Sequence, residues 1–236
     1  MSKTFRHSGD MGDVIFSLPT VRALGGGVLY LDPFGGLSRP LVKWPGRDCT
    51  KLNAEKIGAA REFLCKQPYI EEVRMWASEA CDYDLDEFRR HHRYNNLADA
   101  HLAAFGLPFT ERDTAWLTVD NPVVNPERPI VIHRNLKYHG NDPFWEANLP
   151  AIAPRSMFTG SSVERDAMML AFGHWLFFFQ TPDVTALARV IAGCQQFIGN
   201  QGLPHAIAEG MKKNLICEVD RLYPAAVFQR AGATYV

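Results

Sequence analysis

Two strand–turn–helix units, one in each half of the chain, restrict the fold more than any other feature of the sequence. In His7–Leu24, a Gly-rich turn follows a short strand around Thr4–His7 and leads into a helix expected to be amphipathic. In Gln196–Met211, the turn Gly199–Gly202 separates an apolar strand from a helix that begins near Pro204, where a missing N–H costs nothing. Each turn therefore lies at the carboxyl end of a strand, where open α/β sheets bind ligands.

Strands and helices alternate along the second half of the chain. This alternation predicts a parallel sheet with right-handed crossovers. The predicted strands are Ile130–His133, Met157–Thr159, Trp175–Phe179, Gln196–Ile198 and Leu215–Cys217, and the predicted helices are Ser162–Phe172, Asp183–Ala192 and Pro204–Gly210. Ser161 or Ser162 is expected to cap one helix with Glu164 close behind, and Thr181 precedes Pro182 at the start of the next.

The first half is also predicted to contain both strands and helices. Glycines at 25–27 end the first helix, and the segment Pro33–Asp48 is expected to form a surface loop or lid. Further predicted elements are the strands Val28–Asp32 and Glu72–Trp76 and the helices Asn53–Lys66 and Leu97–Phe105.

The best candidate for a domain linker is Val119–Pro129. This segment, VDNPVVNPERP, carries three prolines and little hydrophobic periodicity. We therefore expect an N-terminal domain over 1–120 and a C-terminal domain over 129–236, each of a usual domain size. Two ligand turns in two halves suggest two nucleotide-fold domains that face each other across a cleft.

Composition argues against several classes of protein. The 25 Lys and Arg residues balance the 26 Asp and Glu residues, so no net charge attracts nucleic acid or an anionic membrane. The five cysteines show no CxxC or Cys/His ligand spacing and are expected to be reduced. The N-terminus lacks an apolar signal segment, and no apolar run approaches the ~20 residues of a membrane span. We expect a soluble, cytoplasmic protein.

The turn Gly199–Gly202 is a candidate phosphate site. Asn200, Gln201 and His205 are expected at the end of the strand, and Gly202 leaves the backbone free to approach a ligand. Free N–H groups at a helix start attract phosphate. The competing interpretation is an ordinary βα turn with a half-buried histidine.

Three segments together resemble glycosyltransferase family 9, the ADP-heptose:lipopolysaccharide heptosyltransferase group, and more broadly the GT-B glycosyltransferases. GDMGDVIFSLPTVRAL is similar to the family's N-terminal Gly-Asp helix, and VIHRNLKYHGNDPFW to the strand and basic loop near the donor pyrophosphate. LARVIAGCQQFIGNQGLPHAIAEGMKK resembles the family's donor-binding segment. The resemblance implies two Rossmann-like domains and sugar transfer from a nucleotide-diphosphate sugar to a hydroxyl acceptor, with no further cofactor and no metal.

The resemblance also assigns roles to single residues. Asp13 falls on the family's catalytic base, which would take a proton from the acceptor hydroxyl. A helix cap is an equal alternative for Asp13, and capping is favoured for Asp10. Gly12, in the same turn, is expected to be a donor-binding residue.

On the donor side, Arg134 and Lys137 would neutralise the leaving diphosphate, and the alternative is a pair of solvated loop cations. Asn200, Gly202 and His205 match the donor-binding turn. Asn200 stands where heptosyltransferases usually carry Asp, which leaves the sugar open. Glu218 would bind ribose hydroxyls, although acidic strand ends are common without a ligand.

Other functions stay open. The acceptor is a glycan, another hydroxyl compound or a hydroxymethylated nucleic-acid base, in which case Arg89–Tyr94, RRHHRY, would contact the backbone. A second alternative is a non-catalytic nucleotide-binding protein of the same fold. A dehydrogenase is disfavoured because GDMGD lacks the GxGxxG spacing, with Asp32 the closest match to the acidic partner. The DxDxD spacing in Asp82–Asp86 indicates a turn before a helix rather than a metal site.

Overall fold

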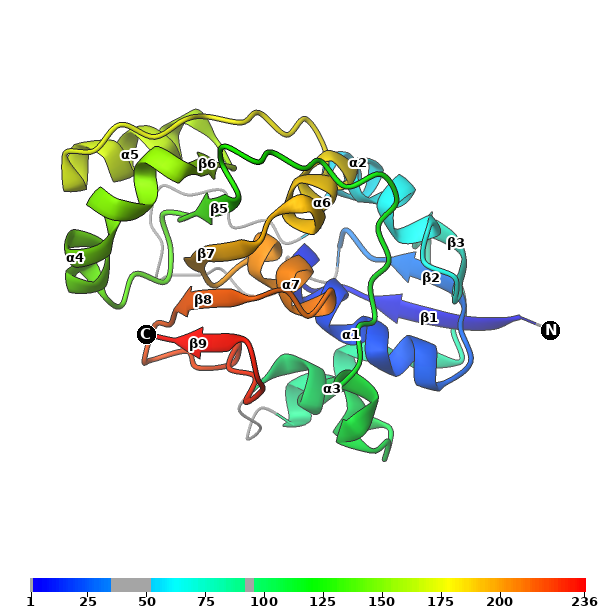
Figure 1. The fold of residues 1–236 in the computed structure, drawn as a ribbon. Coiled ribbons are helices and arrows are strands. Elements are labelled where there is room, and N and C mark those ends of the chain that lie inside the picture. The colour runs from blue at the N-terminus through cyan, green and yellow to red at the C-terminus, as the bar shows by residue number, and fades with distance from the viewer. Residues whose placement is uncertain (1, 35–51, 92–95) are drawn as a thin grey trace. The chain divides into compact units, whose positions relative to one another are not determined.

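A computed structural model of the 236-residue chain describes residues 2–34, 52–91 and 96–236 (Figure 1). The chain divides into two compact units, Met1–Trp116 and Leu117–Val236. Both are α/β units, and every strand pair in them is parallel, as predicted. The predicted linker Val119–Pro129 contains neither helix nor strand. The domain limits 1–120 and 129–236 remain a prediction.

The first unit is built on a four-stranded sheet of order β3-β2-β1-β4. Because the strand order reverses at β1, ligands are expected beyond the carboxyl ends of β1 and β4. Its elements are β1 (Lys3–His7), α1 (Met11–Ala23), β2 (Gly27–Leu31), α2 (Ala54–Cys65), β3 (Ile70–Met75), β4 (Tyr83–Asp84), η1 (Leu85–His91), α3 (Leu97–Ala104) and η2 (Phe109–Arg112).

Helix α1 differs from the expected amphipathic helix. Nine of its 13 residues are buried, including the polar Ser17 and Thr20, so apolar and polar faces are both covered. The physical reason is tertiary, because α1 packs against both α3 and η2. Its start also lies earlier than expected, because Asp10 is the N-cap and Asp13 belongs to the first turn.

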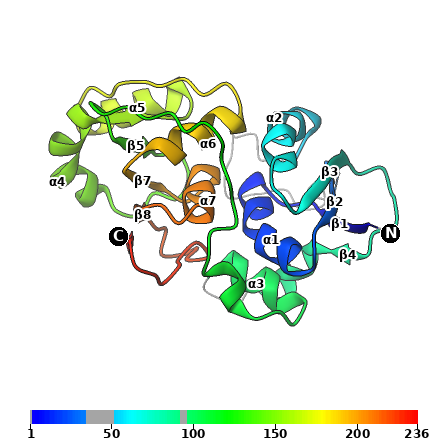
Figure 2. The same ribbon diagram turned by 45° about the vertical axis from the view of Figure 1, so that its right-hand side comes forward.

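The second unit is built on a five-stranded sheet of order β6-β5-β7-β8-β9 (Figures 1 and 2). Here the order reverses between β5 and β7, which makes their carboxyl ends the expected ligand edge. Its elements are β5 (Ile130–His133), α4 (Asp142–Ile152), η3 (Ala153–Arg155), β6 (Ser156–Phe158), α5 (Ser162–Phe172), α6 (Val184–Gly193), β7 (Gln196–Asn200), α7 (Leu203–Gly210), β8 (Leu215–Glu218) and β9 (Ala233–Tyr235).

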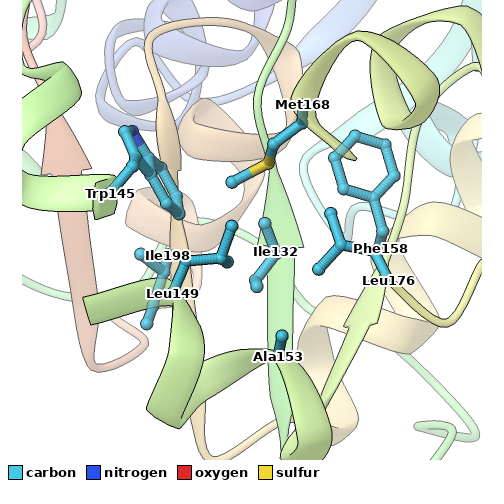
Figure 3. Close-up of a cluster of buried hydrophobic side chains, with 8 residues drawn as sticks. All are labelled: Ile132, Trp145, Leu149, Ala153, Phe158, Met168, Leu176 and Ile198. Carbon is cyan, nitrogen blue, oxygen red and sulfur yellow. The ribbon is translucent and has the colours of Figure 1, made fainter. Parts of the chain in front are cut away.

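The core of the second unit forms where α4 and α5 cover one face of this sheet. Ile132 and Ile198 point from neighbouring strands toward Trp145 and Leu149 of α4, and Met168 of α5 closes the cluster (Figure 3). All five side chains are at most 2% exposed. Burying an apolar side chain of this size stabilises the fold by about 1.5–3 kcal/mol. Because strand side chains alternate between faces, the intervening residues of β5 and β7 are available to α6 and α7.

The second unit differs from the prediction in its elements and in one helix cap. Helix α4 and strand β9 were not predicted. The predicted strand Trp175–Phe179 forms only one bridge, from Phe178 to Phe158, at the edge of the sheet. Ser161 caps α5 in a capping box with Glu164, as predicted, but Asp183 rather than Thr181 caps α6, since its side chain accepts from the N–H of Ala186.

Two further observations concern the whole described chain. Most of the segment expected to form a surface loop or lid, residues 35–48 of Pro33–Asp48, lies outside the described residues. Among the helices of the described parts, none combines the length and apolarity needed to cross a membrane.

Candidate functional site

Asn200 organises the ligand edge of the second sheet. Its side chain is completely buried at the end of β7, and Oδ1 accepts from the Asn135 N–H at 2.9 Å. Its Nδ2 donates to the Lys137 carbonyl at 2.6 Å and to the Asn135 carbonyl at 3.1 Å. An amide satisfies this mixture of donors and acceptors, whereas a carboxylate cannot donate to the two carbonyls. Asn200 therefore holds the loop after β5 in place, and the donor contact expected of its amide stays a prediction.

Gln201 links the same turn to the loop after β8. Its Nε2 donates to the Tyr223 carbonyl at 2.6 Å, and its Oε1 accepts from the Asp220 N–H at 2.8 Å. Asn135 Nδ2 in turn donates to the Gln201 carbonyl at 2.6 Å. The Asn200–Gln201 turn thus fixes the loops on both sides of it.

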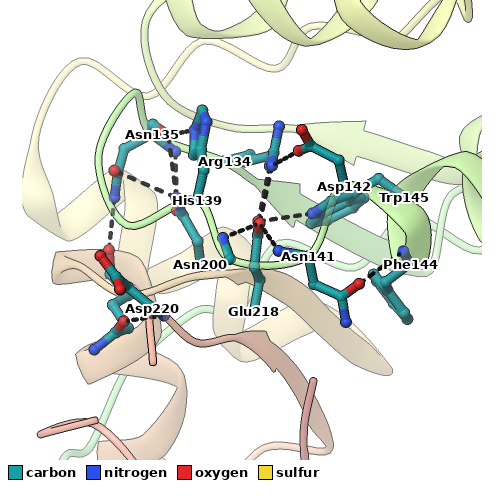
Figure 4. Close-up of polar contacts among 12 residues, drawn as sticks. Arg134, Asn135, His139, Asn141, Asp142, Phe144, Trp145, Asn200, Glu218 and Asp220 are labelled. Carbon is teal, nitrogen blue, oxygen red and sulfur yellow. Dashed lines mark hydrogen bonds and ion pairs between the residues drawn. The ribbon is translucent and has the colours of Figure 1, made fainter. Parts of the chain in front are cut away.

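Glu218 and Arg134 form a buried clamp at this edge (Figure 4). Glu218 accepts five hydrogen bonds, two from Arg134 and one each from the N–H groups of Gly140, Asn141 and the Trp145 indole, at 2.8–2.9 Å. Burial alone would raise the pKa of Glu218, but these donors outweigh it and lower the pKa to about 2. Glu218 is therefore ionised and held by five protein donors, and the ribose-binding role predicted for it stays a prediction.

The same contacts revise the prediction for Arg134. Its guanidinium is only 4% exposed, and it contacts Asp142 at the start of α4 as well as Glu218. It also lies over the rings of Trp145 and Phe172. Arg134 joins β5, β8 and α4, and its charge is balanced by two carboxylates inside the unit. Its predicted contact with the leaving diphosphate stays a prediction.

Lys137 differs from Arg134 in its surroundings. It is half-buried in the loop between β5 and α4, and its ammonium makes neither a hydrogen bond nor an ion pair with the residues that the structure describes. Its backbone is fixed, since its N–H donates to Asn135 Oδ1 at 2.7 Å. Lys137 is thus a positioned cation whose charge is available at the ligand edge.

The start of α7 lies at the same edge. Gly202 is the N-cap with φ 155°, and a Cβ there would come within 2.9 Å of Asn135 Nδ2. His205, by contrast, is completely buried, and burial together with Arg230 lowers its pKa to about 3. His205 is therefore neutral and packed edge-to-face with Tyr235, and its predicted donor-binding role stays a prediction.

At the edge of the first sheet, three polar residues of the β1 segment pair with three aspartates around β4. Asp82 accepts from the Thr4 N–H and hydroxyl at 2.8 and 2.9 Å, Asp84 pairs with Arg6 at 3.0 Å, and Asp86 accepts from Ser8. Each pair is 78 residues apart, as the parallel register of β1 and β4 requires. The DxDxD spacing therefore serves strand pairing.

Two histidines lie behind this edge. His7 Nδ1 accepts from the Gly9 N–H at 2.8 Å, which places its proton on Nε2, 3.1 Å from His101 Nε2. His101 Nδ1 then donates to the Leu97 carbonyl at 2.7 Å. Burial and the neighbouring His7 hold the pKa of His101 well below its ordinary value. The two rings form one hydrogen-bonded chain that fixes the turn after β1.

Asp13 lies in the first turn of α1, directly beyond that turn. Its Oδ2 accepts from the Asp10 N–H at 3.1 Å, so it closes the helix start as the capping alternative required. Gly9 fits tightly between its neighbours, because a Cβ there would lie 2.7 Å from Asp13 Oδ2 and 2.5 Å from His7 Cε1. Asp13 is half-buried, and Gly12 beside it is helical rather than part of an open turn.

Other candidate sites find less support. Among the residues that the structure describes, no group of three His, Cys, Asp or Glu side chains is arranged to hold a metal ion. The four described cysteines are free thiols. In the basic run, Arg89 pairs with Asp86 and Arg90 with Glu87, and most of the remainder lies outside the described residues.

Comparison with solved structures decides the fold. A glycosyl transferase of family 9 from Veillonella parvula aligns over 99% of this chain and 84% of its own, with a TM-score of 0.61 at 10% identity. The chain has the glycosyltransferase family 9 fold. Escherichia coli heptosyltransferase WaaC with ADP-2-deoxy-2-fluoro heptose aligns over 100% of this chain and 93% of its own, with a TM-score of 0.57 at 9% identity. E. coli ADP-heptose lipopolysaccharide heptosyltransferase II aligns over 100% and 90%, with a TM-score of 0.54 at 12% identity.

Among the comparisons with known proteins, only that of structures finds this likeness: no protein-family sequence model and no curated protein matches the sequence of the chain. The glycosyltransferase family 9 fold is therefore kept at an identity where few side chains are shared. The fold confirms the resemblance and the GT-B-like α/β class that the sequence predicted.

Within this fold, sequence reasoning placed its candidate donor site at the carboxyl edge of the second sheet, and it missed part of how that edge is built. Asn135 and Trp145 were not singled out, although each contacts a predicted residue. A signal for Asn135 was present, because Asn two residues before Lys137 in a turn-rich loop is typical of an Asx turn. The indole contact of Trp145 depends on tertiary packing and left no local signal.

Proposed function

We propose that the chain is a glycosyltransferase that moves a sugar from a nucleotide-diphosphate sugar to a hydroxyl acceptor. The observation that carries the proposal is Lys137, an available cation beside the start of α7 at the switch point of the second sheet. This edge has the charge and the N–H groups that a diphosphate needs. The likeness to heptosyltransferase structures supports the same chemistry.

In this mechanism the donor diphosphate binds at the edge formed by Lys137 and Gly202. The acceptor oxygen forms a bond to the anomeric carbon while the bond from that carbon to the diphosphate oxygen breaks. Lys137 and the α7 N–H groups stabilise the negative charge that develops on the leaving group. We assign no metal to this step, because these groups supply the positive charge.

Asp13 is proposed as the base that receives the acceptor proton. Its carboxylate is half-buried at the carboxyl edge of the first sheet, where Oδ2 accepts from the Asp10 N–H. The two proposed roles, closing α1 and accepting a proton, are compatible because a carboxylate accepts several hydrogen bonds through its two oxygens.

The first part of the test is donor binding. Titration calorimetry with nucleoside diphosphates is expected to detect binding to the wild type, and Lys137→Ala should weaken it. Arg155→Ala is the matched control, since Arg155 ends η3 at the amino edge of the same sheet. Absence of binding by every nucleoside diphosphate, or equal affinities in the Lys137 and Arg155 variants, contradicts the donor site.

The second part separates the base from the cap. Asp13→Asn retains an oxygen that can accept from Asp10, so the fold should be kept, but the amide cannot accept a proton at neutral pH. Transfer, or donor hydrolysis where no acceptor is known, should fall about 10²- to 10⁴-fold while donor affinity is unchanged. Asp10→Asn, at the N-cap itself, is the control and should keep its activity. Near-normal turnover by Asp13→Asn would refute the assignment.

A further inference from the structure

A chain of hydrogen bonds runs from helix α3 to the turn before Asp13, and its two histidines have no part in the mechanism above. The Leu97 carbonyl accepts from His101 Nδ1 at 2.7 Å, and His101 Nε2 lies 3.1 Å from His7 Nε2. At the other end, His7 Nδ1 accepts from the Gly9 N–H at 2.8 Å. Both histidine side chains are completely buried, so their nitrogens bond within the protein rather than to bulk water.

The two ends of this chain decide where each proton lies. A backbone N–H only donates, so His7 Nδ1 carries no proton and Nε2 is the donor. A carbonyl only accepts, so His101 carries its proton on Nδ1 and its Nε2 accepts from His7. With one proton on each ring, all three bonds form only in this arrangement. His101 therefore selects the tautomer of His7 that accepts from Gly9.

Neighbouring groups hold the two rings without competing for the chain. Phe88 stacks on His101 with ring centroids 4.1 Å apart, and on His7 at 5.8 Å. Asp86 Oδ1 lies 3.7 Å from His7 Nδ1, which is too long for a hydrogen bond, and it accepts from the Ser8 N–H at 3.1 Å instead. The His7 Nδ1 lone pair is thus directed to the turn.

This turn lies directly against Asp13. A Cβ on Gly9 would come within 2.5 Å of His7 Cε1 and 2.7 Å of Asp13 Oδ2, so the ring and the carboxylate pack against the same residue. The next residue, Asp10, donates its N–H to Asp13 Oδ2 at 3.1 Å. Loss of the bond between His7 and Gly9 would therefore move the backbone that Asp13 contacts.

We propose that His101 is a positioning residue for Asp13 and acts through the tautomer of His7. This inference rests on the proposed function, in which Asp13 receives the acceptor proton. The bond from Gly9 to His7 holds the turn on which the Asp13 carboxylate closes. Misplacing a catalytic group by about 1 Å can cost about 100-fold in rate, so loss of His101 reduces turnover and leaves donor binding unchanged.

The experiment compares His101→Leu with His101→Gln, whose Oε1 can accept from His7 in place of Nε2. His101→Leu should lower kcat about 10- to 100-fold for transfer or donor hydrolysis, with an unchanged donor KM. It should also move the carbon NMR resonance of the Asp13 carboxyl, and His101→Gln should restore both. Gln67→Leu, which removes a buried polar side chain just before β3 at the amino edge of the same sheet, is the matched control and should change neither.

A second background separates the tautomer from simple packing. His7→Asn supplies an Oδ1 that accepts from the Gly9 N–H, as in an Asx turn, without help from His101. In this background His101→Leu should lower kcat no further, whereas a packing role would give the same loss in both backgrounds. Nitrogen NMR of the wild type, which needs no variant, should show the proton of His7 on Nε2 and that of His101 on Nδ1.

Three results would overturn the positioning role while the proposed function stands. They are a wild-type kcat and Asp13 resonance in His101→Leu, an equal loss of kcat in the His7→Asn background, and a His7 proton on Nδ1. If the wild type neither transfers a sugar nor hydrolyses a donor, the proposed function fails and the Asp13 resonance decides. A shift in His101→Leu that His101→Gln reverses then supports the positioning, and any other pattern overturns it.

Discussion

Replacing Asn200 by Asp tests whether its amide holds the ligand edge together. Asn200 Nδ2 donates to the Lys137 carbonyl at 2.6 Å and to the Asn135 carbonyl at 3.1 Å, and the side chain is completely buried. Asp would leave the Lys137 carbonyl without this donor and place a carboxylate against both oxygens. The Asn135 carbonyl also contacts His139 Nε2, so its loss is smaller.

The expected cost follows from these contacts. An unsatisfied buried acceptor costs about 1–3 kcal/mol, and the carboxylate adds repulsion, so Asn200→Asp should lose about 2–4 kcal/mol of unfolding free energy at pH 8. Burial and the facing carbonyls should raise the folded-state pKa of the new carboxyl above its unfolded value. The destabilisation is then full at high pH and decreases as the pH falls through the folded pKa, because the protonated acid can donate to one carbonyl.

Urea unfolding followed by circular dichroism at pH 8 and pH 5 measures both effects. Asn53→Asp is the matched control, because Asn53 caps α2 only by accepting from the Lys56 N–H at 2.8 Å. An acidic N-cap fulfils this role equally well, so its stability should be within about 0.5 kcal/mol of the wild type. Wild-type stability of Asn200→Asp at pH 8 would refute the assigned role of the amide.

Two further substitutions test the other contacts at the two edges. Glu218→Gln should cost about 3–5 kcal/mol in urea unfolding, because it leaves Arg134 buried with an incomplete partner. Glu72→Gln, at the solvent-exposed pair with Arg74, should unfold like the wild type. Folding lowers the pKa of Glu218 from 4.5 to about 2, so its contribution to stability is present above pH 4.5 and is lost as the pH falls toward 2. The unfolding free energy of the Glu218→Gln variant should therefore change less with pH over that window than that of the wild type. Parallel pH profiles of the two proteins would contradict the clamp. Gly9→Ala should lose about 1–3 kcal/mol of unfolding free energy and reduce turnover through Asp13, because the new Cβ would lie 2.5 Å from His7 Cε1. Gly58→Ala, in the open middle of α2, should gain about 0.5–1 kcal/mol of unfolding free energy. Equal melting shifts for the two variants would count against the tight fit at Gly9.

The sequence by itself determined the α/β class, the parallel sheets and most element positions. These properties depend on local periodicity and on cap chemistry, which short stretches of chain carry. Helix α5 is an example, because Ser161 and Glu164 specify its start and Gly173, with φ 71°, follows its end. The choice of the Asn200 turn and Lys137 also came from local signals, a strand end, glycines and a nearby basic residue.

Only the tertiary structure decided which polar side chains contact one another. Arg134 and Glu218 are 84 residues apart in the sequence, and the sequence alone gives no sign that they pair. They contact each other because the strand order β5-β7-β8 places the ends of β5 and β8 near one another. The pairing of Thr4 with Asp82 likewise follows from the register of β1 and β4. A residue's type gives its capacity to donate or accept, but strand order and register choose the partner. Burial then fixes its charge, as the lowered pKa of His205 shows.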